Sequence, residues 1–221
     1  MREDICTIPV SDAFETREGC PICRMYNMLE ERALNYIMGA AMMEPDVRIE
    51  TNHLGFCHNH LSNMQKRKGS LQLALMLESH FNEIEEKAFS TKQKDNKKIS
   101  PFLKSCFVCE KVEWGMAHMV ETVYLTFEKD KDFRELFLAQ PTFCLKHYER
   151  LMQGAPKSGL KKYKSEFLTG LSNIVSKTLE EIKGDLKHYC SMFDYRNSGP
   201  DKDWGNSKTA IERAVTFLGE K

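Results

Sequence analysis

Two short patterns of metal-ligand residues each occur twice in this 221-residue chain, in the same order. The stretches GCPICRMYN and SCFVCEKVE hold Cys-x-x-Cys, and the stretches GFCHNHLSNM and TFCLKHYERLM hold Cys-x-x-His. Thiolates and imidazoles at such spacings are typical ligands of a structural metal ion. The order along the chain predicts two Cys3His sets: Cys20, Cys23, Cys57 and His60, then Cys106, Cys109, Cys144 and His147.

The register of the two copies indicates an internal duplication. Cys106 and Cys109 follow Cys20 and Cys23 by 86 residues, and Asp132 and Arg134 follow Asp46 and Arg48 by the same number. One residue is then inserted, because the second Cys-x-x-His follows the first by 87 residues, and Leu151 follows Met64 by 87. So many positions in one register predict two structural repeats.

Apolar residues at intervals of three and four predict helices over 22–41, 112–127, 69–89 and 158–193. No alternating pattern of useful length predicts a strand, and DVRIET is the nearest to one. We therefore expect an all-α fold of two pseudo-symmetric helical-hairpin repeats, each clipped by a Cys3His metal site, with a long helix and a C-terminal strap. The predicted segments are a first repeat (1–90), a linker (91–104), a second repeat (105–192) and a C-terminal loop with a short helix (193–221).

The positions of the Cys-x-x-Cys and Cys-x-x-His pairs explain how one metal ion could link the two helices of each half. In each half, Cys-x-x-Cys precedes the first helix and Cys-x-x-His precedes the second. One ion could then join both helix starts, because residues at i and i+3 lie on the same face of a helix. Three thiolates around a dication leave a net charge of about −1, and Arg24, Arg48 or Arg134 could offset it.

The metal is expected to be zinc, two ions per chain. The N-terminal stretch MREDICTIPVSDAFETREG lacks the uninterrupted apolar core of a secretory signal, so we expect a cytoplasmic protein in which disulfides are disfavoured. An iron–sulfur cluster with Cys3His ligation stays open as an alternative. Four protein ligands close a site, whereas catalytic zinc keeps a position for water.

Charge and hydropathy argue against two classes of partner, nucleic acid and the membrane. Lys plus Arg and Asp plus Glu number 32 each, so the basic excess of a nucleic-acid-binding protein is absent. No run of about 18 apolar residues predicts a membrane-spanning helix. We expect an unidentified protein or small molecule as partner, and the sequence does not fix the oligomeric state.

A family resemblance rests on the doubled motif together with MMEPDVRIETN, CFVCEKVE and the tail FDYRN…DWGNSK. As a set, these segments resemble a bacterial family of uncharacterised proteins, a domain of unknown function in which some members are labelled as substrate-binding components of ABC transporters. The resemblance covers essentially the whole chain. It implies a mostly helical protein with the same two quartets and no established activity.

Two polar segments could form a ligand site instead of serving structure alone. The first holds Glu44, Asp46 and Arg48, and the second, in the turn-rich stretch 193–210, holds Asp194, Arg196, Asn197, Trp204, Asn206 and Lys208. If these segments serve structure alone, the first caps helices, and the second is a C-terminal strap held against the helices by Trp204.

Three functions follow from these observations. We favour a zinc-stabilised helical scaffold or interaction module. A small-molecule-binding protein or enzyme would bring the two polar segments into one cavity, and no nucleophile or nucleotide motif supports it. A thiol-redox or metal-sensing switch would leave one quartet more exposed than the other.

Overall fold

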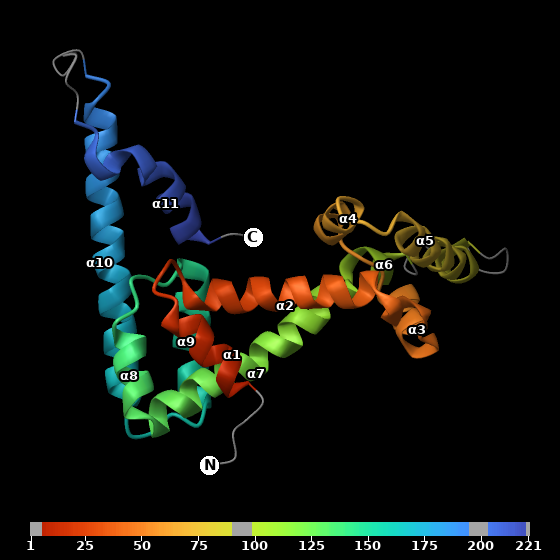
Figure 1. Ribbon diagram of the computed structural model, residues 1–221, viewed down its shortest axis with the longest axis horizontal. Coiled ribbons are helices and arrows are strands. Elements are labelled where there is room, and N and C mark those ends of the chain that lie inside the picture. Colours follow the sequence, from red (N-terminus) through yellow and green to blue (C-terminus); the bar gives the residue numbers. More distant parts are fainter. Residues whose placement is uncertain (1–5, 90–98, 195–202, 220–221) are drawn as a thin grey trace. The chain divides into compact units, whose positions relative to one another are not determined.

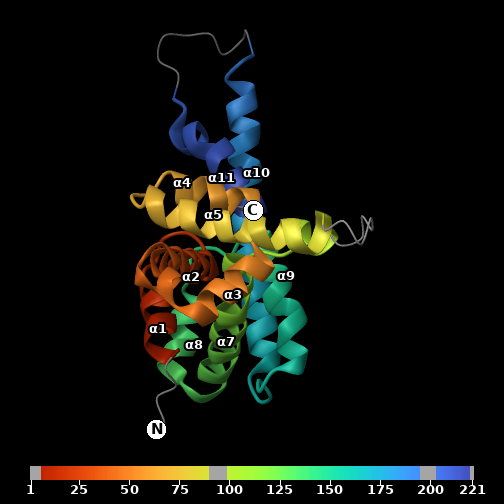
Figure 2. The same cartoon turned by 90° about the vertical axis from the view of Figure 1, so that its right-hand side faces the viewer.

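The computed structural model describes residues 6–89, 99–194 and 203–219 (Figures 1 and 2). Within these ranges the chain forms eleven α-helices joined by short turns and has no strand, which confirms the all-α prediction. The α-helices are α1 (Thr7–Glu15), α2 (Pro21–Met38), α3 (Pro45–Leu54), α4 (His58–Gln65), α5 (Ser70–Ile84), α6 (Ser100–Lys104), α7 (Phe107–Lys129), α8 (Lys131–Leu138), α9 (Leu145–Gly154), α10 (Lys164–Ser191) and α11 (Ala210–Leu218).

The duplication is visible in the order of the helices. A long helix, a short helix, the Cys-x-x-His helix and a second long helix follow one another as α2 to α5 and again as α7 to α10. The residues before the two Cys-x-x-His helices also share a backbone conformation, with φ −70° and ψ 160° at Cys57 and φ −69° and ψ 156° at Cys144. Met64 and Leu151, which share the sequence register, are both fully buried.

Two elements differ from the sequence expectation. The segment around DVRIET is the helix α3, in which Pro45 occupies the first turn and Asp46 lies near the positive N-terminal end. Helix α10 begins at Lys164, six residues later than the apolar spacing suggested, because residues 155–163 form a tight 3-10 turn and a loop. The predicted linker, 91–104, includes α6, and its first eight residues lie outside the described ranges.

The chain forms two compact units that do not coincide with the two repeats. Unit 1 comprises Met1–Met25 and His118–Lys221, and unit 2 comprises Tyr26–Ala117. The division falls inside α2 and inside α7, so each of these helices contributes residues to both units. None of the described helices combines the length and apolar character needed to cross a bilayer.

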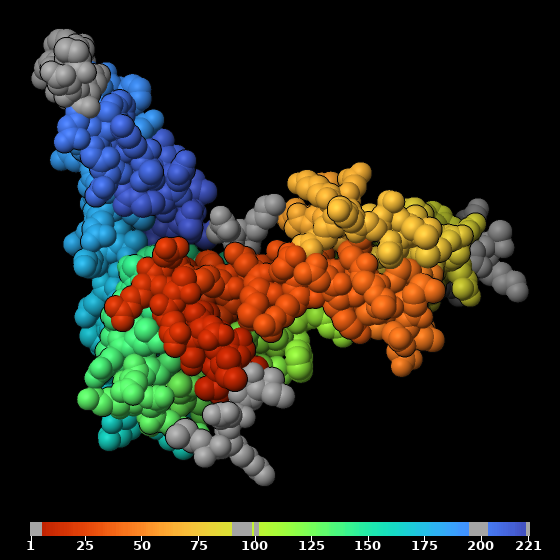
Figure 3. All heavy atoms as spheres, in the orientation of Figure 1, coloured from red at the N-terminus to blue at the C-terminus, as the bar shows by residue number. Residues whose placement is uncertain are grey.

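An aromatic cluster forms the core of unit 1. Phe137 on α8 lies at the centre, with ring centroids 4.7 Å from Phe167, 5.1 Å from Phe127 and 5.1 Å from Phe143. Phe14 of α1 joins it at 5.6 Å. Burial of such rings supplies much of the hydrophobic stabilisation of a helical unit. Helix α11 packs along α10 in the same unit, as the blue elements of Figure 3 show.

Unit 2 is built around the second half of α2 and the first half of α7. Leu34, Ile37 and Met76 are buried, and a side chain at Gly115 would lie 3.0 Å from Leu29 Cδ1. This glycine therefore lets α2 and α7 approach closely. Phe56 and Phe107 meet edge to face, with centroids 6.3 Å apart.

Candidate metal centres

The first cluster, site I, consists of Cys20, Cys23, Cys144 and His147, all in unit 1. The Nδ1 atom of His147 lies 3.1 Å from Cys144 Sγ, 3.3 Å from Cys23 Sγ and 3.7 Å from Cys20 Sγ. The Sγ atoms of Cys23 and Cys144 are 3.6 Å apart. All four ligand atoms therefore surround one point.

The second cluster, site II, consists of Cys57, His60, Cys106 and Cys109, all in unit 2. The Nδ1 atom of His60 lies 3.2 Å from Cys57 Sγ, 3.3 Å from Cys106 Sγ and 3.5 Å from Cys109 Sγ. The Sγ atoms of Cys57 and Cys109 are 3.9 Å apart. The two sites thus have the same arrangement of ligand types.

The structure uses all eight predicted residues but pairs them differently from the expectation. Each site combines the Cys-x-x-Cys of one repeat with the Cys-x-x-His of the other. The expected sets, Cys20 and Cys23 with Cys57 and His60, and Cys106 and Cys109 with Cys144 and His147, are therefore wrong in their pairing. The reason is that both pairings give three cysteines and one histidine with the same local spacing, so the motif alone cannot choose between them.

Helix starts position all eight ligands. The carbonyl oxygens of Cys20, Cys57, Cys106 and Cys144 each accept the N–H four residues later, which makes each cysteine the residue that opens its helix. The other ligand of each pair follows in the first turn. Two helix N-termini therefore meet at each site, and their partial positive charge favours thiolates there.

Buried phenylalanines anchor the Cys-x-x-His pairs. Phe143 precedes Cys144 and belongs to the aromatic core of unit 1, and Phe56 precedes Cys57 and packs on Phe107 in unit 2. In site II, the carbonyl of Gly55 also accepts a hydrogen bond of 2.9 Å from the Phe107 N–H. Packing of these phenylalanines thus positions the Cys-x-x-His half of each site.

The donor distances fit one tetrahedral ion per site. With Zn–S near 2.3 Å and Zn–N near 2.05 Å, tetrahedral angles place two sulfurs about 3.8 Å apart and a sulfur and a nitrogen about 3.6 Å apart. The observed S–S separations are 3.6 and 3.9 Å, and the S–N separations run from 3.1 to 3.7 Å. Cysteine thiolates with imidazole are also the donor set that zinc prefers.

The raised pKa values of two neighbouring thiols in site I also favour a bound cation. Burial, followed by hydrogen bonding to Cys144, raises the pKa of Cys20 to about 11. Hydrogen bonds to Cys144 and Cys20 and burial hold the pKa of Cys23 far above its ordinary value. Three neighbouring thiols therefore cannot all ionise on their own, whereas a coordinated dication deprotonates its thiol ligands.

Two further residues bear on the charge of the sites. The Oε1 atom of Glu30, on α2, lies 2.9 Å from Nε2 of His60. This contact orients the imidazole ring so that Nδ1 faces the thiols of site II. Near site I, burial lowers the pKa of Arg24 by more than the charge of nearby side chains such as Cys20 raises it, and the Arg24 guanidinium donates to the carbonyl of Ala13. Of the other two candidate arginines, Arg134 donates to the carbonyl of Phe127 at 3.0 Å and stacks on Tyr163 at 3.8 Å, and Arg48 is half-buried on α3.

Glu30 has no counterpart in the second repeat. Its register position there is Met116, which lacks a carboxylate, and the described residues give Nε2 of His147 no hydrogen-bond partner. Sequence reasoning missed Glu30 because it lies on the helix that starts at site I, whereas its partner belongs to site II. Only the exchanged pairing reveals this contact.

The two sites differ in exposure. In site I, Cys20 and Cys144 are 5% and 2% exposed, and Cys23 is half-buried. In site II, Cys106 is 4% exposed, but Cys57 is half-buried and Cys109 is exposed. Site II therefore presents one of its four candidate ligands, the Cys109 side chain, to solvent.

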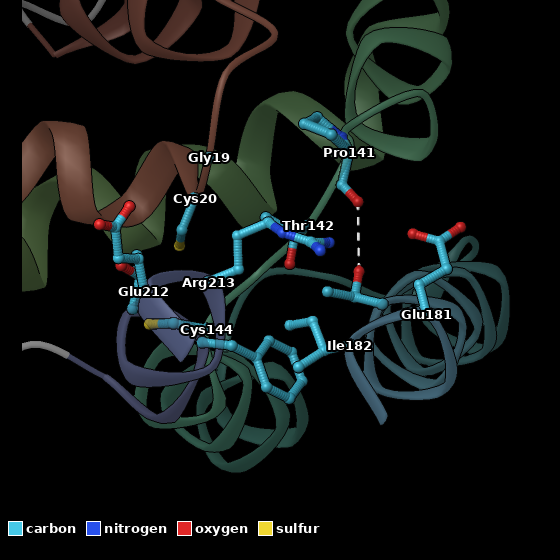
Figure 4. A pocket seen from close by; sticks show the side chains of 12 residues that line it. Gly19, Cys20, Pro141, Thr142, Cys144, Glu181, Ile182, Glu212 and Arg213 are labelled. Atoms are coloured by element: carbon cyan, nitrogen blue, oxygen red, sulfur yellow. Dashed lines mark hydrogen bonds between the residues drawn. The ribbon is translucent and has the colours of Figure 1, made fainter. Parts of the chain in front are cut away.

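A pocket of about 430 Å³ lies beside site I in unit 1 (Figure 4). Cys20 and Cys144 line one side, and α10 and α11 contribute Ile182, Phe217 and Arg213. The Arg213 guanidinium bonds Asp185 at 2.5 Å and the Asn206 carbonyl at 2.9 Å. The lining is largely apolar, and it also includes the charged side chains of Glu181, Glu212 and Arg213.

None of the nine residues predicted for a ligand site lines this pocket among the described residues. Glu44, Asp46 and Arg48 belong to unit 2, at the start of α3, whereas Asp194, Trp204, Asn206 and Lys208 belong to unit 1. Arg196 and Asn197 lie outside the described residues.

Trp204 does pack against α10. Its ring lies 5.4 Å from Tyr189 and 5.8 Å from Phe193. This contact agrees with the structural interpretation of the tail, in which an aromatic side chain fixes the C-terminal strap to the long helix.

Comparisons with known proteins gave one match. Neither the curated proteins nor the solved structures contain a significant match to this chain. A family model described as a family of unknown function, DUF6062, matches residues 1–221. The chain therefore belongs to this family, and its two Cys3His clusters are features of a member of DUF6062.

Proposed function

We propose that each cluster binds one Zn²⁺ and that the protein is a zinc-stabilised helical scaffold that presents its surface to a partner. The observation that supports this proposal is the convergence of the ligands. In each cluster, three Sγ atoms and one Nδ1 atom lie within 4.8 Å of one another, at the spacing of a single tetrahedral ion.

A structural role is favoured over a catalytic one by the ligand count. Four protein donors complete a tetrahedron and leave no position for water or substrate. The ligand residues also serve the fold directly, since each site joins two helix starts that are far apart in sequence, such as Cys20 and Cys144. When bound, the ion supplies charge neutralisation for the thiolates and a link between the two helices.

The stabilisation expected from such links is large. Structural zinc contributes on the order of 10 kcal/mol of apparent binding free energy at neutral pH, compared with about 5–15 kcal/mol for the net stability of a whole domain. Several helices are short: α4 buries only His60 and Met64, and α9 only His147 and Leu151. These helices depend on the metal for their position.

Elemental analysis of protein purified without added metal, together with its visible spectrum, tests the proposal. We expect close to two zinc ions per chain and a colourless protein. Removal of the metal by a strong chelator should lower the helical signal in circular dichroism, and added zinc should restore it. Iron with sulfide, a brown protein, or a metal-free chain with unchanged stability would contradict the proposal.

A mononuclear ion is favoured over an iron–sulfur cluster by the same distances. A cluster of several metal ions spreads its terminal ligands over different irons, which places their sulfurs farther apart than those of a tetrahedron around one ion. The S–S separations of 3.6 and 3.9 Å match the single ion. Spectroscopy separates the two cases, because iron–sulfide centres absorb visible light and zinc thiolates do not.

A further inference from the structure

The two sites are built from the same ligand types but expose them differently. Site I keeps Cys20 and Cys144 almost fully buried, whereas the Cys109 side chain of site II is exposed to solvent. Oxidants attack thiolates rather than thiols, and susceptibility follows thiolate character and exposure. A metal-bound cysteine is held as a thiolate, so Cys109 combines both requirements.

A second thiolate lies within reach of Cys109. Cys57 Sγ is 3.9 Å away and is half-buried, whereas Cys106, the neighbour in the Cys-x-x-Cys, is 4% exposed. A disulfide needs an S–S distance of about 2.0 Å, so the two sulfurs must approach by about 1.9 Å. Side-chain rotation can supply this movement once the metal no longer holds them apart.

We propose that site II is a modification site for peroxides, with Cys109 as the attacked ligand and Cys57 as its resolving partner. This inference rests on the proposed metal binding and adds regulation to it. Oxidation would release the ion from site II, replace the metal link between the starts of α4 and α7 by a disulfide, and leave site I intact. Unit 2 would then lose its metal while unit 1 keeps its own.

The chemistry balances with hydrogen peroxide as the oxidant. The Cys109 thiolate attacks one oxygen of the peroxide, and the O–O bond breaks. Hydroxide departs as the leaving group, and Cys109 becomes a sulfenic acid. The Cys57 thiolate then attacks that sulfur, an S–S bond forms, the S–O bond breaks, and a second hydroxide leaves. Two thiolates lose two electrons and the peroxide gains them. Only Cys106 and His60 remain as ligands, and two donors do not retain a structural ion.

The pocket beside site I provides the competing route. Cys20 and Cys144 line it, so a small oxidant could approach site I from there. The comparison of the two sites must therefore be made within one molecule, at graded doses of peroxide. The two cysteines outside the sites, Cys6 and Cys190, should first be replaced by serine so that neither can form a disulfide with a ligand.

The Cys6→Ser, Cys190→Ser protein should be treated with hydrogen peroxide and analysed for bound metal and for alkylated peptides. Trypsin separates the two Cys-x-x-Cys pairs, because one lies in residues 18–24 and the other in residues 105–111. We expect metal content to fall from two ions to one, with the peptide of Cys57 disulfide-linked to the peptide of Cys109 and Cys20 and Cys23 still protected. Earlier loss at site I, equal loss at both sites, or a Cys106–Cys109 disulfide would overturn the inference.

Histidine variants give the matched control. Cys109→His keeps four ligands as Cys2His2 and removes the exposed thiolate, whereas Cys23→His makes the equivalent change in site I. At the dose that releases one ion from the parent, the Cys109→His protein should keep both ions, and the Cys23→His protein should still lose the ion of site II. Metal loss from Cys109→His at the parent's rate would overturn the role of Cys109. A parent protein that holds no metal before treatment would instead refute the proposed metal binding, so the two failures are distinguishable.

Discussion

Replacement of Glu30 by alanine should weaken site II and leave site I unchanged. The Oε1 atom of Glu30 lies 2.9 Å from Nε2 of His60, and this contact selects the tautomer that presents Nδ1 to the metal. Loss of such an outer partner typically lowers metal affinity by about 10–100-fold, which is about 1.4–2.7 kcal/mol. The Glu30 side chain is 27% exposed, so water can take the place of the carboxylate in the alanine variant. We therefore expect an affinity loss at the lower end of this range, about tenfold.

The assay is a titration of the zinc-loaded protein with a chelator of known affinity, with each Cys-x-x-Cys peptide probed by alkylation at every step. Glu30→Gln should fall between the parent and Glu30→Ala, because the amide keeps a hydrogen bond without the charge. Glu31→Ala is the matched control, since Glu31 neighbours Glu30 on α2 but pairs with Arg67. An unchanged site II affinity, or an equal loss at site I, would refute the role assigned to Glu30.

Three further predictions concern stability and metal retention. Phe137→Ala removes the central ring of the unit 1 cluster, which is fully buried, and should cost about 3–5 kcal/mol in denaturant unfolding; a cost below about 1 kcal/mol would contradict the assigned core. Gly55→Ala should weaken metal retention at site II in the chelator titration, because φ is +61° and the new Cβ would lie 2.6 Å from His80 Cε1; parent-like retention would contradict this close approach. Burial raises the pKa of Glu128, but hydrogen bonds from the N–H groups of Lys162, Lys161 and Tyr163 lower it by more, so the net pKa lies below its ordinary value of 4.5. Its stabilising contribution is therefore present above that value and is lost as pH falls through the folded pKa, so Glu128→Gln should be less stable than the parent at pH 7 and the difference should shrink on acidification.

The helices and the ligands could be predicted because their signals are local. Apolar residues at three- and four-residue intervals placed α2, α5, α7 and α10, and the spacing within each motif identified the ligand pairs. The repeat register also identified His60 as a ligand residue, and the structure confirms that His60 lies in the cluster.

The pairing of the motifs could not be predicted because it depends on the path of the chain between them. After Cys23, α2 continues to Met38, and its 18 residues rise about 27 Å before the chain turns. After Cys109, α7 continues to Lys129. Each of these helices carries the chain from one compact unit into the other, where it meets the Cys-x-x-His of that unit. Nothing in the spacing distinguishes this exchange from two independent hairpins.

The role of Glu30 was hidden for the same reason. Its partner, His60, lies 30 residues later in the sequence, and the expected pairing gave no reason to bring the middle of α2 beside α4. The polar segment that begins at Glu44 was also ambiguous. Its sequence allowed a ligand site, but Asp46 and Arg48 lie on helix α3, where side chains at alternate positions point in different directions.

The exchanged pairing of the ligands can be tested by the metal content of two double variants. Cys23→Ser with His147→Ala removes two ligands of site I and should leave one zinc ion per chain, because site II keeps all four of its ligands. Cys23→Ser with His60→Ala removes one ligand from each site and should reduce or abolish binding at both. The opposite result, with metal retained at one full site only in the second variant, would show that each repeat binds its own ion and would contradict the account.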